Sequence, residues 1–346
     1  MLRYLTAGES HGRALLAILE GMPAGLKIKI DRVNLELKRR QQGYGRGKRM
    51  EIERDKVEIL SGLKNNLTLA SPIGILIKNR DFAIDKLSQV ISPRGGHADL
   101  AGLLKYGFSD IRCVLERASA RETAARVAIG AICKIFLEEF SIRINSRVLE
   151  IKGKTNKTQI KKIIDEARKT KDTVGGIFEV KVKNVIPGLG SYVHPDRRLD
   201  SCLAQAIISI PGIKAVQIGL GFGYADKFGS LVHDAIYYSK TKGFYRKTNN
   251  AGGIEGGVSN GEDIVLRACM KPISTLLAPL ASVNIKTKAK AKASIQRSDI
   301  CVVEAAGVIA EAVVAFELAR AFLEKFGSDA LSDIKDSYKN YIKRLK

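Results

Sequence analysis

The clearest pattern of hydrophobic and polar positions lies between residues 119 and 140 and predicts a long helix. Ser119 is followed three residues later by Glu122, which is the spacing of a capping box at a helix start. Apolar residues then recur three or four positions apart, and most of them are small: Ala124, Val127, Ala128, Ala131 and Ile135. Because small side chains let a helix approach its neighbours closely, we expect this helix to pack at the centre of the molecule.

Other stretches predict a mixture of helices and strands. Apolar positions with a helical period predict helices at 31–40, 155–170, 199–210 and 303–326, with a polar tail helix at 329–346. Alternation and β-branched residues predict strands at 2–6, 174–185, 214–219, 262–270 and 281–287, and several short strands with a turn at Pro72 within 57–78. No repeat or linker interrupts the chain, so we expect a single domain over residues 1–346.

Composition narrows the class of protein. The chain has 346 residues, 45% of them hydrophobic, which is typical of a globular protein. No apolar run approaches the roughly 20 residues of a membrane helix, and the N-terminus does not resemble a signal peptide. We therefore expect a cytoplasmic protein without a membrane partner. The five cysteines are odd in number and lack CxxC spacing, which argues against disulfides and against a zinc site.

The formal net charge of +22 indicates an anionic partner or substrate. Nucleic acid is one such partner, and a basic nucleic-acid-binding protein is the alternative function that the charge leaves open. Tryptophan is absent, aromatic residues make up only 6%, and no basic stretch is interleaved with Phe or Tyr, which disfavours a stacking surface for bases. Lysine-rich surfaces also occur for solubility or growth temperature alone, so the charge does not decide the matter.

A glycine-rich stretch near residue 250 suggests a place where backbone meets a ligand. Five glycines fall between Gly252 and Gly261, with Glu255 the lone acid among them and without a role that we can assign. A predicted strand follows, and after it come Lys271 and the hydroxyls of Ser274 and Thr275. Backbone amides, a lysine and hydroxyls together can form a phosphate socket. The alternative is an ordinary glycine-rich surface loop.

Two of the four histidines lie in unusual settings. His11 stands between Ser10 and Gly12 after the first predicted strand, and His97 follows a glycine pair with Arg94 three residues before it. Histidine, with an unperturbed pKa of about 6.5, suits proton transfer at neutral pH. His194 and His233 lack such settings and are interpreted as ordinary loop or strand residues.

Basic residues concentrate at two further places. A loop with three glycines carries Arg39, Arg40, Arg46, Lys48 and Arg49, and it is either a solvated basic loop or a clamp on an anionic substrate. Its spacing is not that of a Walker loop, and residues 219–223 do not match the dinucleotide fingerprint GxGxxG. Arg117 and Arg121 bracket the start of the central helix, where free amides already favour an anion.

At seven places, in family order, the sequence resembles chorismate synthases. The matching segments are TAGESHG (6–12), RRQQGYGRGKRM (39–50), PRGGHADLAG (93–102), RASARETAARVAIGA (117–131), NNAGGIEGGVSNG (249–261), KPIST (271–275) and RSDICVVEAAGVIAEAV (297–313). One departure is Gly95, where the family pattern has proline. The segment between residues 80 and 92 is also shorter than in many relatives.

The resemblance implies an α+β fold, a β-α-β sandwich in which central helices are covered by antiparallel sheets, assembled as a homotetramer. It implies anti-1,4-elimination of phosphate from 5-enolpyruvylshikimate 3-phosphate to give chorismate. It also implies reduced FMN as cofactor without net redox change, and it associates NADP with the family. Two carboxylates and a phosphate on the substrate, with another phosphate on FMN, account for the arginines better than nucleic acid does.

Residue by residue, the resemblance implies the following roles. His11 is similar to the acid that serves the leaving phosphate, with Ser10 beside it; His97 to the histidine that manages the proton state of the reduced flavin; and Asp299 to the carboxylate that helps remove the ring proton. Substrate ligands are implied at Arg40, Arg46, Arg49, Arg94, Arg121 and Arg297. FMN contacts are implied at Arg117, Ala118, Ser119, Pro211, Gly212, Gly256, Lys271, Pro272, Ile273, Ser274, Thr275 and Arg297.

Overall fold

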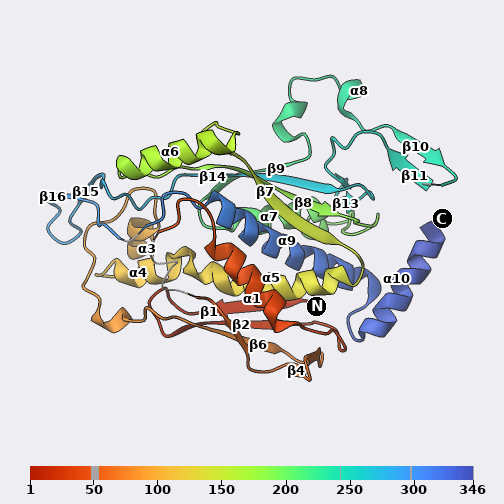
Figure 1. Cartoon of the computed structure of the whole chain (residues 1–346), viewed down its shortest axis with the longest axis horizontal. Helices are drawn as coiled ribbons and strands as arrows, with labels where there is room; N and C mark the ends of the chain where they lie inside the picture. Colours follow the sequence, from red (N-terminus) through yellow and green to blue (C-terminus); the bar gives the residue numbers. More distant parts are fainter. Residues whose placement is uncertain (48–53, 242, 297, 346) are drawn as a thin grey trace.

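The structure is a computed structural model that describes residues 1–47, 54–241, 243–296 and 298–345. Its elements form three layers, in which helices lie between two antiparallel sheets (Figure 1). This is the α+β sandwich that the sequence predicts.

The first sheet is built mainly from the N-terminal strands. Its order is β1-β2-β6-β3, with β1 at Arg3–Ala7, β2 at Ala14–Glu20, β6 at Ile73–Lys78 and β3 at Val57–Ile59. Every neighbouring pair is antiparallel. In β2 the side chains of Leu15, Ala17 and Leu19 are buried while their neighbours are not, so this strand turns one face to the helices.

The second sheet lies on the other side of the helices. Its order is β7-β8-β14-β9, with β7 at Arg143–Ile151, β8 at Gly176–Lys183, β14 at Ile264–Met270 and β9 at Ile213–Ile218. These pairs are antiparallel too. The central position of β14 matters for function, because the strand connects the glycine-rich stretch at its start with Lys271 at its end.

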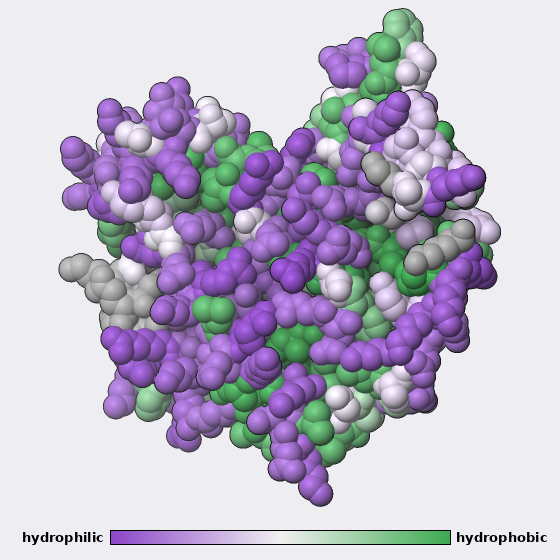
Figure 2. Space-filling view, turned by 45° about the vertical axis from the view of Figure 1, so that its right-hand side comes forward, coloured by the Kyte–Doolittle hydropathy of each residue, from purple (hydrophilic) through white to green (hydrophobic). Residues whose placement is uncertain are grey.

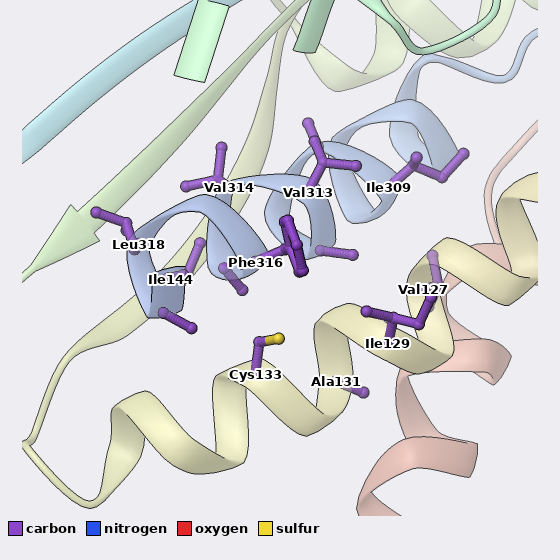
Figure 3. Close-up of a cluster of buried hydrophobic side chains, with 14 of the residues drawn as sticks. Val127, Ile129, Ala131, Cys133, Ile144, Ile309, Val313, Val314, Phe316 and Leu318 are labelled. Carbon is purple, nitrogen blue, oxygen red and sulfur yellow. The ribbon is translucent and has the colours of Figure 1, made fainter. Parts of the chain in front are cut away.

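The middle layer is organised by two helices in close contact, α5 (Thr123–Glu138) and α9 (Val303–Phe326). A methyl group added at Gly130 on α5 would lie 2.4 Å from the Cα of Ala312 on α9, so glycine is required for this approach. Figure 3 shows part of this core, to which α5 contributes Val127 and Cys133 and α9 contributes Ile309 and Phe316. The layer is completed by α1 (Ile30–Gln41) and α7 (Leu199–Ile208).

A buried carboxylate ties these layers together. Glu311 on α9 is completely buried, and it accepts hydrogen bonds from Arg39 on α1, Lys134 on α5 and Ser146 on β7. Burial alone would raise the pKa of Glu311, but these donors outweigh it and lower the pKa to about 2. The charge therefore persists in the core at neutral pH.

Shorter elements cover the edges of the sandwich. Among the described residues, further helices are α3 (Asp99–Tyr106), α4 (Arg112–Ala118), α6 (Lys157–Lys169), α8 (Gly229–Val232) and α10 (Leu331–Leu345). Single 3-10 turns lie at Ile84–Lys86, Ala120–Glu122, Pro195–Arg197 and Gly221–Tyr224. Four hairpins pair β4 (Leu63–Lys64) with β5 (Leu67–Thr68), β10 (Ile236–Ser239) with β11 (Gly243–Arg246), β12 (Ile254–Glu255) with β13 (Val258–Ser259), and β15 (Ala281–Val283) with β16 (Lys290–Lys292).

The segment that contains α8, β10 and β11 projects from the body of the molecule (Figure 1). Its exposed apolar side chains include Phe222, Phe228, Leu231 and Phe244. Figure 2 shows a face that is mostly hydrophilic, in keeping with the high charge, with hydrophobic residues on a projection at its upper right.

Several predicted boundaries differ from the observed ones. The helix predicted from Ser119 starts as a 3-10 turn, and the Ser119 hydroxyl accepts from the amide of Arg121, not from that of Glu122. The capping box is therefore wrong in detail, because Glu122 pairs with Arg126 instead. The strand predicted at 281–287 ends at Val283. The Asn284 side chain accepts hydrogen bonds from the backbone amides of Lys286 and Thr287, and this forms a turn. In the described ranges, no helix is both long and apolar enough to span a bilayer.

Candidate active site

Most of the predicted site residues lie at one end of the sandwich, where α3, α4, the start of α9 and the end of β14 are found (Figure 1, left). Each is placed by the end of a helix or strand. Scaffolds commonly present reactive groups in this way, because the element is rigid while its terminal loop is free to be shaped.

His11 lies in the loop between β1 and β2 and is held by a buried carboxylate. Its ring Nδ1 is 3.0 Å from both Oε1 and Oε2 of Glu116, and its backbone amide donates to Oε2 at 2.8 Å. Glu116 is on α4 and also accepts from Arg112 at 3.3 Å. Burial tends to raise the pKa of Glu116, but the bonds from His11 and Arg112 outweigh it and lower the pKa, so Glu116 is an anion.

The chain beside His11 is fixed by α4 and the turn after it. Ser10 is buried, and the Ser119 hydroxyl donates to the Ser10 hydroxyl at 3.2 Å. Arg117 donates to the carbonyls of Gly8 and Thr6 at 2.9 and 3.0 Å. The structure therefore brings four predicted residues together: Ser10, His11, Arg117 and Ser119.

His97 is held by a second buried carboxylate. Its Nδ1 lies 2.6 Å from Oδ1 of Asp99, the first residue of α3, whose side chain is fully buried. Arg94 donates to both oxygens of Asp99, at 2.8 and 2.9 Å, and to the hydroxyl of Thr275 at 2.7 Å. Burial opposes ionisation of Asp99, yet the bonds from His97 and Arg94 lower its pKa well below the ordinary value.

The segment after β14 reaches the loop that carries His97. The Lys271 ammonium donates to the carbonyl of Gly96, and the Lys271 amide donates to the carbonyl of Gly212 at 2.9 Å. Burial and the nearby Lys214 lower the pKa of Lys271. In the part of the chain that the structure describes, neither lysine forms an ion pair. Among the described residues, positive charge therefore exceeds negative charge at this place.

A cluster of arginines surrounds the start of α5. Arg121 donates to both oxygens of the buried Asp55, at 2.7 and 2.8 Å, and to Asn79 at 2.9 Å. Arg40 donates to the Thr123 hydroxyl at 2.9 Å and to the carbonyl of residue 120 at 2.8 Å. Its Nη1 is buried, lies 3.7 Å from Asp55, and has no hydrogen-bond partner among the described residues.

The pKa of Arg40 is changed by these surroundings. Burial, with help from Arg121 and Arg46, lowers the pKa of Arg40 to about 10, although Asp55 and Asp299 oppose the shift. Among the described residues, the guanidinium groups of Arg40, Arg46 and Arg121 thus lie with the carboxylates of Asp55 and Asp299. A buried guanidinium whose pKa is lowered in this way favours an anion as its ligand.

Asp299 lies just before α9 and faces the glycine-containing loop that follows α1. Its Oδ1 accepts from the Gly47 amide at 2.5 Å, and its Oδ2 is 3.3 Å from Nη1 of Arg46. The same loop is anchored on α6, because the Tyr44 hydroxyl donates to Asp165 at 2.8 Å. Arg49 and Arg297, two other predicted ligands, lie outside the described residues.

The glycine-rich stretch is separated from the end of β14. Gly253 packs on the backbone of Asp263 at the start of this strand, whereas Lys271 follows its last residue. Gly256 forms the exposed turn between β12 and β13. Glu255 pairs with Arg246 at 2.6 and 2.8 Å, which gives this acid a structural role at the base of the projecting segment. Pro211 and Gly212, by contrast, lie beside Lys271.

Sequence reasoning missed four polar residues that hold the site: Asp55, Asn79, Asp99 and Glu116. Asp55 lies 66 residues before its partner Arg121, and Glu116 lies 105 residues after His11, so no local pattern connects them. Only Asp99 had a local signal, since it follows His97 by two positions.

Comparisons with known proteins find similarity to one family along the whole chain. The profile of the family described as chorismate synthase matches residues 2–323. A chorismate synthase of Thermoanaerobacter pseudethanolicus is 53% identical over 348 residues, covering 100% of this chain and 99% of the relative. One of Geobacter sulfurreducens is 49% identical over 391 residues, covering 100% of both chains. A crystal structure of a chorismate synthase superposes with a TM-score of 0.83 at 42% identity, covering 99% of this chain and 98% of that one.

Proposed function

The chain belongs to the chorismate synthase family, and on that premise we propose how its site performs the reaction. The enzyme is a carbon–oxygen lyase that eliminates phosphate from 5-enolpyruvylshikimate 3-phosphate to give chorismate. The observation that carries the proposed mechanism is the pair of histidine–carboxylate contacts beside a cluster of buried arginines.

We assign substrate binding to the arginine cluster. Arg40 offers a buried Nη1 that has no hydrogen-bond partner among the described residues, and an anionic substrate would supply one. Arg46 and Arg121 add positive charge at the same place. Arg94 contributes differently, because its guanidinium is already occupied by Asp99 and Thr275. We propose that Arg94 stabilises the site through Asp99 and Thr275. The anionic groups of the substrate are proposed to bind to Arg40, Arg46, Arg121, Arg49 and Arg297.

Two proton movements accompany the elimination. His11 donates a proton to the leaving phosphate, with the buried Ser10 beside it. Asp299 accepts the proton from carbon 6 of the ring. Because the Gly47 amide and Arg46 hold the Asp299 carboxylate, its orientation toward the substrate is fixed.

Reduced FMN is the proposed cofactor, and one observation tests whether the residues fit it. Lys271 and Lys214 form a cationic site without an ion-pair partner in the described ranges, which suits the FMN phosphate. Bare backbone at Gly95 leaves space for a flat ring, since an added methyl would meet only Leu280, at 3.8 Å. The reduced flavin, when bound, lends electron density to the ring and recovers it.

The residues proposed to hold FMN come from several loops. His97 holds or releases a proton at its imidazole beside the flavin. The contacts are proposed at Arg117, Ala118, Ser119, Pro211, Gly212, Gly256, Lys271, Pro272, Ile273, Ser274, Thr275 and Arg297. Gly256 is the outlier of this set, because its turn lies beyond the start of β14 while Lys271 follows the end of the strand.

We further propose that the enzyme is a cytoplasmic homotetramer and that NADP is associated with its flavin. Support for assembly comes from the projecting segment, whose exposed Phe222, Phe228 and Phe244 have the character of a protein interface. The nucleic-acid-binding alternative has no support, since the family match explains the cationic site and several arginines already pair with internal carboxylates.

Flavin binding tests the cofactor proposal. Lys271→Met removes an ammonium that is proposed to face the phosphate, so FMN with substrate should bind about 10-fold to 100-fold more weakly, as expected for a charge-assisted hydrogen bond. The measurement is the flavin difference spectrum on adding both ligands. Lys64→Met, on an exposed hairpin, is the matched control and should leave binding unchanged. Equal affinities for FMN in the wild type, Lys271→Met and Lys64→Met would refute the assignment of Lys271 to the FMN phosphate.

A further inference from the structure

Both site histidines share one arrangement that the proposed roles do not explain. In each, ring Nδ1 faces a carboxylate that is almost completely buried: Glu116 for His11, at 3.0 Å, and Asp99 for His97, at 2.6 Å. The two carboxylates come from different helices, α4 and α3. The arrangement therefore occurs twice, on two helices that follow each other in the chain.

The partners of each carboxylate determine which ring nitrogen carries the proton. An ionised carboxylate only accepts hydrogen bonds, so the ring nitrogen that faces it must be the donor. Glu116 already accepts from the His11 amide and from Arg112, and Asp99 accepts from the amide and guanidinium of Arg94. These donors keep both carboxylates ionised.

His97 has a second neighbour that could have reversed this assignment. Nη2 of Arg94 lies 3.1 Å from Nδ1 of His97 and 3.4 Å from Nε2, and a guanidinium can only donate. The same Nη2, however, is closer to Oδ1 of Asp99, at 2.9 Å, and Nδ1 itself is 2.6 Å from that oxygen. The contact between Nδ1 of His97 and Oδ1 of Asp99 is the shortest and needs a proton between the two atoms. Because Asp99 is ionised, this proton belongs to Nδ1.

We propose that Glu116 and Asp99 are positioning residues of the reaction, each of which fixes its histidine with the proton on Nδ1 and leaves Nε2 to exchange protons in the site. For His11, Nε2 then takes up a second proton, and the resulting imidazolium delivers that proton from Nε2 to the leaving phosphate while Nδ1 keeps its own proton toward Glu116. For His97, Nε2 is the atom beside the flavin. This inference rests on the proposed function and assigns roles to two residues that do not themselves contact the substrate.

The hydrogen bonds around the carboxylates prevent them from turning away. Glu116 binds both the backbone and the ring of His11, so the loop and the imidazole are held as one unit. Asp99 is clamped at both oxygens by Arg94, and Arg94 is in turn held by Thr275. Fixing a histidine tautomer with a buried carboxylate is a known way to prepare a general acid or base.

The central test replaces Glu116 with glutamine, which keeps the shape of the side chain but can offer an NH2 group to the ring. Glu116→Gln should lower kcat by about 10²-fold to 10⁴-fold, as loss of the correct tautomer does in hydrolases, while KM stays within about 3-fold of wild type. Glu179→Gln is the matched control, because Glu179 is equally buried but pairs with Arg147 and Arg267 instead of a histidine. It should leave kcat unchanged.

A second readout does not depend on activity. The chain has only four histidines, so ¹⁵N-histidine labelling gives a simple spectrum in which nitrogen shifts distinguish the two neutral tautomers. His11→Gln identifies the His11 signals. Wild type should show the proton on Nδ1 of His11, and Glu116→Gln should move it to Nε2 in part or entirely. A His11 proton on Nε2 in the wild type, or identical spectra and kcat in both proteins, would overturn the inference.

Asp99→Asn provides an independent arm if Glu116→Gln does not fold. It should lower kcat at nearly constant KM and move the His97 proton in the same way. A wild-type enzyme with no turnover would contradict the proposed function itself. Normal wild-type turnover, together with variants that keep full kcat, would contradict only the positioning roles.

Discussion

The arginines of the site differ in how much of their charge remains for a ligand. Arg94 binds both oxygens of Asp99 and the hydroxyl of Thr275, so most of its donors are occupied within the protein. Arg40, which is equally buried, has no hydrogen bond at Nη1 within the part of the chain that the structure describes, and its pKa is lowered to about 10. A buried donor without a partner is costly unless a ligand satisfies it, which makes Arg40 the arginine most directly suited to an anion.

The two histidines give the first prediction at this scale. His11→Ala and His97→Ala should each lower turnover by about 10²-fold to 10⁴-fold, the usual contribution of a general acid or base. His194→Ala is the control, because His194 is exposed and belongs to no site cluster. Steady-state rates under anaerobic conditions provide the measurement, and near-normal rates in both variants would remove the roles assigned to these histidines.

Local sequence identified the histidines and arginines but not the groups that hold them. Glycines next to His11 and His97 mark places where the backbone turns, and this is visible in a single segment. The contacts of Glu116 with His11 and of Asp55 with Arg121 join segments far apart in the chain. Such contacts arise from tertiary packing, so neither the hydrophobic periodicity nor the spacing of residues in the sequence predicts them.

Among the elements, long helices with a regular apolar pattern were predicted best. The predicted helix at 303–326 coincides with α9, which is buried along most of its length. The short helices α3 and α4 were missed, because eight or fewer residues offer no clear period. Strand β2 was missed as well, since its residues 14–19 are continuously apolar and do not alternate in sequence.

The close approach of α5 and α9 leads to a prediction about stability. Gly130→Ala places a methyl group 2.4 Å from the Cα of Ala312, and backbone atoms there cannot move aside cheaply. The substitution should lower the free energy of unfolding by about 1–3 kcal/mol, measured by urea denaturation. Gly95→Ala is the control, because its methyl meets only Leu280, at 3.8 Å, and no loss is expected. Equal losses in the two variants would contradict the proposed packing.

The buried carboxylate of α9 gives a prediction about pH. Its folded-state pKa is lowered from 4.5 to about 2, so its stabilisation is complete above pH 4.5 and is lost as the pH falls through this window. Glu311→Gln removes the buried charge and leaves Arg39 and Lys134 with Glu36 as their shared carboxylate, which should cost about 3–5 kcal/mol at neutral pH. The difference between wild type and variant should shrink as the pH falls to about 3. A difference that stays constant with pH would contradict this account.

At the scale of the whole molecule, the sandwich explains why the site is at one end. Both sheets and the central helices end there, so loops from the first sheet, from α9 and from β14 come together on a rigid body. The sequence predicted the class of fold through its resemblance to the family. It did not reveal that the glycine-rich stretch and Lys271 occupy opposite ends of β14. The two segments are close in sequence, but the extended strand between them holds them apart in space.

The central claim is that this site eliminates phosphate from 5-enolpyruvylshikimate 3-phosphate with the help of reduced FMN. The most direct measurement supplies both compounds to the purified protein under anaerobic conditions and quantifies chorismate, phosphate and the flavin together. We expect chorismate and phosphate to form in equal amounts while the reduced flavin is not consumed. Absence of both products under these conditions would contradict the account.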